Sequence, residues 1–128
     1  MQSIFVGENY NPAILERAIR VLKEEAYSLG VNSIITPLST DPERAFIEQW
    51  RGQWVAVHKP SWAAAPLHKR ERLSQRDMDL LESATYQQIA VSEEVGDRIF
   101  TEETLTNVFM VRRSAAILAI WDGKSPGR

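Results

Sequence analysis

Short apolar runs alternate with longer amphipathic segments along this chain, and this alternation limits the fold more than any other feature. Five segments have the length and apolar character of buried strands, at residues 4–6, 31–36, 54–57, 89–91 and 115–121. Between most of them, apolar residues recur every three or four positions, as along one face of a helix. Strands that alternate with helices build βαβ units, whose right-handed crossovers place helices on both faces of a parallel sheet. The pattern therefore predicts an α/β fold, a three-layer sandwich around a mostly parallel five-stranded sheet.

Capping residues mark the expected ends of the first two helices. Each start has an N-cap residue followed by proline, which suits the first helical position: Asn11-Pro12 and Asp41-Pro42. Each end has a glycine just beyond the last periodic residue: Gly30 and Gly52. These signals predict one helix before the second strand and another before the third strand.

The second half of the chain has weaker helix signals. Residues 60–66 form an expected loop, and residues 67–84 are expected to be helical in two pieces, with Ser74 and Asp77 as a capping box between them. Residues 101–113 form the last expected helix. Its predicted inner side carries three apolar residues: Leu105, Val108 and Phe109.

Composition excludes several classes of protein. A length of 128 residues fits one domain, and the net charge of −2 argues against general nucleic-acid binding. The absence of cysteine excludes disulfides and thiolate metal ligands. No apolar run approaches the roughly 20 residues that cross a bilayer, and no signal peptide is visible at the start of the chain. We therefore expect a cytoplasmic protein with no membrane association, no metal site and no cofactor.

In an open parallel sheet, ligands bind outside the carboxyl ends of the strands, where the strand order reverses. This rule places four segments in one neighbourhood: residues 7–11, 36–41, 58–62 and 122–127. His58 belongs to this edge by position, whereas His68 lies in a charged stretch typical of a solvated helix face.

The end of the chain carries the most specific motif. Asn107 and Met110-Val111 precede an apolar strand, which ends in the turn Trp121-Asp-Gly-Lys-Ser-Pro-Gly127. This order resembles the closing signature of the SLOG (LOG/DprA-like) Rossmannoid superfamily, with Thr106 where that family has an arginine. Residues 4–7 and 54–60 resemble the family's first and third strands in pattern. The resemblance implies a Rossmann-like, single SLOG-like domain over residues 1–128, lacking the family's usual final helix, with a nucleotide-like ligand.

Two departures from the family pattern affect the expected activity. The family's glycine-rich phosphate loop corresponds to residues 36–41, which contain no glycine. Hydroxyl groups of Thr36, Ser39 and Thr40 still offer hydrogen bonds to a phosphate there, whereas Asp41 would repel it. The glutamate-bearing glycine motif of the family's phosphoribohydrolases is absent, so no catalytic residue carries over and an enzyme is not the leading expectation.

Strand-end position and resemblance together nominate eight ligand-binding residues: Gly7, Glu8, Thr36, Ser39, Asn107, Asp122, Gly123 and Ser125. Each has a plainer interpretation. The 122–127 turn is also what a tight exit from a strand requires, Asn107 also suits a helix-to-loop hydrogen bond, and Glu8 also suits solvent.

Three hypotheses about function follow. The first is binding of a nucleotide or nucleotide-derived small molecule by a sensor, a sequestering protein or a degenerate enzyme relative. The second is a hydrolase or transferase acting on the N-glycosidic bond of a nucleotide, with Glu8 or Asp122 as the working carboxylate. The third is a protein-interaction domain that has lost the ligand site. Because the missing final helix would leave a sheet face open, we also expect a homodimer or larger assembly.

Overall fold

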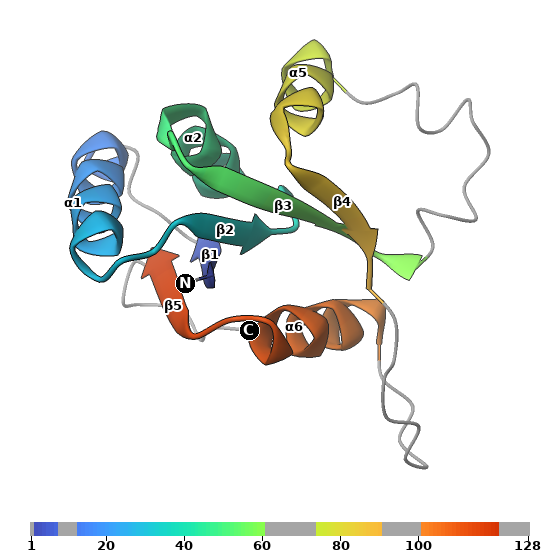
Figure 1. Cartoon of the computed structure of the whole chain (residues 1–128). Helices are drawn as coiled ribbons and strands as arrows, with labels where there is room; N and C mark the ends of the chain where they lie inside the picture. Colours follow the sequence, from blue (N-terminus) through green and yellow to red (C-terminus); the bar gives the residue numbers. More distant parts are fainter. Residues whose placement is uncertain (1, 8–12, 61–73, 91–100, 121–128) are drawn as a thin grey trace.

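A computed structural model describes residues 2–7, 13–60, 74–90 and 101–120 of the chain (Figure 1). Its sheet has five strands, in the order β4-β3-β2-β1-β5. The strands are β1 (Gln2–Gly7), β2 (Ser33–Thr36), β3 (Gln53–His58), β4 (Tyr86–Ile89) and β5 (Ala116–Ile120). Every neighbouring pair is parallel. The predicted α/β fold with a five-stranded parallel sheet is therefore confirmed.

The helices cover the two faces of the sheet unequally. Those in the described residues are α1 (Leu15–Ser28), α2 (Asp41–Gln49), α5 (Gln75–Ser83) and α6 (Glu102–Arg112). Figure 1 shows α1, α2 and α5 on one face and α6 on the other. The strand order explains this, because β1 to β4 follow one another in one direction, and right-handed crossovers then keep their helices on one side. The chain returns from β4 to β5 across the sheet, so α6 lies on the opposite face.

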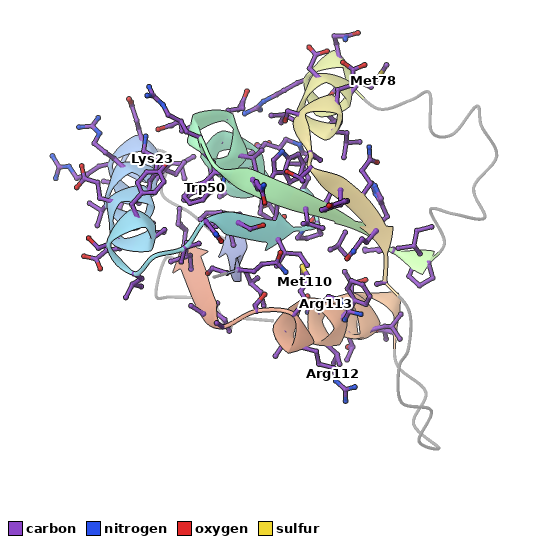
Figure 2. All side chains as sticks on the ribbon, in the orientation of Figure 1. Lys23, Trp50, Met78, Met110, Arg112 and Arg113 are labelled. Atoms are coloured by element: carbon purple, nitrogen blue, oxygen red, sulfur yellow. The ribbon has the colours of Figure 1, made fainter. Side chains whose placement is uncertain are left out.

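Alternating side chains of the strands divide the core between these faces. Phe5, Ile34 and Trp54 point toward α1 and α2, where they pack with residues such as Phe46. The neighbouring strand positions point toward α6: Ile4, Ile35, Val55 and Val57. They form a smaller cluster with Ala90 and with Phe109 and Met110 of α6. Figure 2 shows Met110 and Arg113 directed from α6 toward the sheet and Arg112 directed away from it. The fold is thus a Rossmann-like three-layer sandwich.

The first helix ends as predicted. Gly30 has a φ of +79°, which favours glycine. Its N–H donates to the carbonyl of Tyr27, and the N–H of Val31 donates to the carbonyl of Ala26. These two bonds form a Schellman motif, which satisfies the last carbonyls of the helix. The predicted start at Asn11-Pro12 lies outside the described residues, and the described helix begins after Ile14.

The predicted ends of α2 are each displaced. The N-cap is Thr40, whose hydroxyl accepts from the Glu43 N–H at 3.4 Å, so Asp41 and Pro42 are already helical. The helix ends at Gln49, and Gly52 does not cap it. Gly52 instead makes room for an indole, since a Cβ there would lie 2.9 Å from the ring of Trp50.

Two further predictions need correction. The fourth strand was expected at residues 89–91, but β4 spans Tyr86–Ile89. All four of its residues are exposed at the sheet edge, so no apolar run marks it. In α6, Val108 was expected to face inward, yet it is exposed, and Thr106 and Met110 are buried instead. The predicted helix start at Ser74 is confirmed, because its hydroxyl accepts from the Asp77 N–H at the start of α5. The first of the two expected pieces, before Ser74, lies outside the described residues.

Of the helices in the described ranges, none has the length and apolar character needed to cross a membrane.

Candidate functional site

The strand order reverses between β1 and β5. Strands β1 to β4 are successive neighbours, whereas β5 lies on the other side of β1, with Gly7 and Ile120 paired at the carboxyl edge. This is the topological switch point of the sheet, where α/β proteins place their ligand crevices. Gly7 therefore lies at the expected position. Four predicted residues that follow these two strands lie outside the described residues: Glu8, Asp122, Gly123 and Ser125.

Thr36 is the last residue of β2 and reaches the same edge. The register pairs it with Ala56 on β3, and the preceding residue, Ile35, pairs with Ile4 on β1. Its exposed fraction is 0%, and its Oγ1 has no hydrogen-bond partner among the described residues. Because Ile34 packs on the α2 side, alternation places the Thr36 side chain on that side as well. An unsatisfied buried hydroxyl costs about 1–3 kcal/mol, so the Thr36 hydroxyl lowers the stability of the folded protein.

The loop between β2 and α2 has an unusual backbone conformation and hydrogen-bonds a carboxylate of α2. Leu38 has a φ of +54°, in the left-handed region that side chains rarely adopt, while its own side chain is buried. The N–H of Ser39 donates to Oε1 of Glu43 at 2.8 Å, and the Ser39 hydroxyl donates to the same oxygen at 3.1 Å. Glu43 is the third residue of α2 and has an exposed fraction of 3%. Its carboxylate thus lies at the helix N-terminus, where the helix dipole favours negative charge.

Sequence reasoning did not single out Glu43. The available signal was the Thr40-x-x-Glu43 spacing of a capping box. The carboxylate here bonds the N–H of Ser39, one residue before the N-cap. Ser39, which was nominated as a ligand residue, therefore gives its amide and its hydroxyl to a side chain of its own loop.

Asp41 was expected to repel a phosphate, and the structure pairs it with an arginine. Arg44 Nη1 lies 3.2 Å from Oδ1 of Asp41, and Arg44 Nε lies 2.7 Å from Oδ1 of Asp77 on α5. The hydrogen bond to Asp77 is the largest cause that raises the pKa of Arg44 above its ordinary value, against desolvation, which lowers it. The positive charge of Arg44 is thus used inside the α2–α5 contact.

The remaining predicted residues lie apart from this loop. His58, at the end of β3, is nearly buried, and its Nε2 lies 3.0 Å from Oε1 of Gln87 on β4. Asn107 is half-buried on α6, across the sheet from α2. The structure therefore brings Gly7, Thr36 and Ser39 to one edge, and Asn107 belongs to the opposite layer. In the described part of the chain, no cluster of three or more metal-ligating side chains is present.

The chain has no match among family models, curated proteins or solved structures. Its fold makes it a Rossmann-like α/β protein with an all-parallel sheet. The likeness to the SLOG superfamily is an inference from the sequence motifs.

Proposed function

We propose that this protein binds a nucleotide or nucleotide-derived small molecule at the carboxyl edge of the sheet, as a sensor, a sequestering protein or a degenerate relative of SLOG enzymes. The observation that carries the proposal is the buried hydroxyl of Thr36, unpartnered among the described residues. Buried polar groups almost always have a partner, and an exception calls for an explanation such as function. Valine would fill the same space without the unsatisfied hydroxyl. A ligand that hydrogen-bonds this group explains a threonine here.

The topology supports the same location. Thr36 ends the strand beside β1, and β1 with β5 forms the switch point. Of the eight residues nominated from the sequence, the proposed contacts are Gly7 and Thr36 at the described strand ends, together with Glu8, Asp122, Gly123 and Ser125, which follow β1 and β5 in the sequence. Ser39 and Asn107 are not included, because Ser39 donates to Glu43 and Asn107 belongs to α6 on the other face of the sheet.

The Thr36→Val variant tests this proposal. Without ligand, we expect its free energy of unfolding to rise by about 1 kcal/mol, because the unsatisfied hydroxyl is removed without a change of shape. A ligand that binds the wild type should add about 1.4 kcal/mol of stability at ten times its Kd. We expect the variant to bind that ligand about tenfold more weakly. The measurement is thermal unfolding with a panel of nucleosides and their mono-, di- and cyclic phosphates.

Ser33→Ala is the matched control, because Ser33 lies at the amino end of the same strand and donates to Gln2. This control should leave any ligand shift unchanged. The proposal fails if no member of the panel stabilises the wild type, or if the Thr36 and Ser33 variants weaken binding equally.

We also propose that a second copy of the chain covers the α6 side of the sheet. Ile117 on β5 is paired with Ile4, whose side chain faces α6, yet its exposed fraction is 61%. Val108 and Val111 of α6 are exposed as well, at 38% and 53%. A helix with apolar residues on its outer side is typical of an element that is covered on both sides.

Light scattering measures this association. We expect at least twice the chain mass of 14.6 kDa at micromolar concentration, and we expect Ile117→Lys to lower that mass, because a charge at the interface disfavours association. Val21→Lys is the control, since Val21, with an exposed fraction of 53%, lies on α1, on the other side of the sheet. A wild-type mass of one chain would contradict the proposal.

A further inference from the structure

Among the described strands, β5 forms one edge of the sheet and pairs with β1 (Figure 1). The carbonyl of Ala116 points toward β1, because the Ser3 hydroxyl donates to it at 3.1 Å. The N–H and C=O groups of successive residues point to opposite sides of a strand, so those of Ile117 and Ala119 point away from β1. They have no hydrogen-bond partner in the described part of the chain. The outer side of β5 therefore carries unpaired donors and acceptors.

The side chains of β5 leave this edge unprotected. Folded proteins protect an edge strand with charged side chains, proline or a bulge. The five residues of β5, Ala116-Ile-Leu-Ala-Ile120, are all apolar, and their register with β1 runs without a bulge. Ile117 is 61% exposed, and Ala119 is exposed as well. An open, uncharged and apolar edge of this kind is a template for another strand.

We propose that β5 of a second copy of the chain pairs antiparallel with this edge, so that the two sheets become one continuous sheet. The strand is complementary to itself when Leu118 lies opposite Leu118 of the second copy. In that register, Ile117 lies opposite Ala119 of the second copy. Because the backbone groups of both residues point outward, they exchange both hydrogen bonds of a ladder pair. The proposal rests on the association proposed above and names the strand through which the two copies meet.

Side-chain size and charge favour an identical strand as the occupant of this edge. In the same register, each isoleucine of β5 lies opposite an alanine, since Ile120 lies opposite Ala116 of the second copy. Directly opposite residues lie on the same face of a sheet, so each large side chain packs beside a small one. Because β5 carries no charged residue, two identical strands do not repel each other there.

Disulfide cross-linking tests the register, since the chain has no cysteine of its own. The Ile117→Cys and Ala119→Cys variants are mixed in equal amounts and oxidised. Residue 117 of one copy and residue 119 of the other then have Cα atoms about 5.5 Å apart, within the range of a disulfide. In either variant alone, the two cysteines are diagonal neighbours at about 7–8 Å, beyond that range. We expect about tenfold more linked dimer from the mixture than from either variant alone.

The yield of linked dimer and the mass of the wild type together separate the two proposals. If the wild type has the mass of more than one chain, but the mixture gives no more linked dimer than the single variants, the association stands and the β5 contact is refuted. If the wild type has the mass of one chain, the association fails, and the β5 contact fails with it.

The Ala119→Pro variant tests the backbone hydrogen bonds. Proline removes the outward N–H of residue 119 and no bond to β1, a change that an edge strand tolerates. We expect the mass to fall to that of one chain, 14.6 kDa, whereas the matched Ala119→Ser variant retains the N–H and should keep the wild-type mass. Circular dichroism establishes that the proline variant is folded, and an unchanged mass then overturns the proposal. If this variant does not fold, the cross-linking comparison decides.

Discussion

Replacing Phe46 by alanine is expected to lower the free energy of unfolding by about 3–5 kcal/mol, the largest loss that we predict for a single substitution. Phe46 is fully buried on α2, and its ring stacks on Phe5 of β1 with the centroids 4.1 Å apart. It also stacks on Trp50, with centroids 5.7 Å apart. Its removal leaves a cavity between α2 and the centre of the sheet that these large rings cannot close.

Urea unfolding followed by fluorescence measures this loss as a lower midpoint with an unchanged slope. Phe46→Leu retains most of the volume and should cost less than about 2 kcal/mol. Val21→Ala, at an exposed position on α1, should change stability by less than about 0.5 kcal/mol. A loss below about 1 kcal/mol for the alanine variant would show that α2 does not pack on the sheet as described.

Replacing Arg44 by methionine should have the second largest effect, a loss of about 2–3 kcal/mol. The substitution keeps most of the apolar stem but leaves Asp77, whose side chain is 12% exposed, without its partner at 2.7 Å. Breaking a fully buried ion pair costs about 3–5 kcal/mol, and the partial exposure of Arg44 reduces this value by solvent screening.

Arg76→Met is the matched control for Arg44. Arg76 joins the same two helices through Glu48, but both side chains of that pair are more than 40% exposed. The Arg76→Met variant should therefore lose less than about 1 kcal/mol of stability.

The pKa of Arg44 is raised above its ordinary value, chiefly by the hydrogen bond to Asp77. A group whose pKa is raised on folding contributes its full stabilisation at any pH below its ordinary pKa. This contribution is lost only as the pH rises through the raised pKa of the folded protein. The loss caused by Arg44→Met should therefore be the same at about pH 7 and about pH 9. Equal losses for the Arg44 and Arg76 variants would contradict the difference in burial.

The position of the candidate site was predictable in part. The rule on strand ends pointed to residues 7–11 and 36–41, and the structure brings Gly7 and Thr36 to the edge where the strand order reverses. The loop sequence did not predict that Leu38 adopts a left-handed conformation or that the Glu43 carboxylate accepts hydrogen bonds from Ser39. Asn107 was grouped with this edge because of a motif, and its helix lies on the other face of the sheet.

Local features of the chain were determined by its sequence alone. The alternation of strands and helices, the Schellman glycine at Gly30 and the helix starts at Ser74 and Thr101 all depend on residues within about five positions of one another. Tertiary structure decided features that depend on distant partners. The exposed edge strand β4 forms because β3 pairs with it, and the Arg44–Asp77 ion pair joins residues 33 positions apart. Periodicity and capping are short-range interactions that a sequence displays directly, whereas strand order, burial and ion pairing are set only when separate elements pack together.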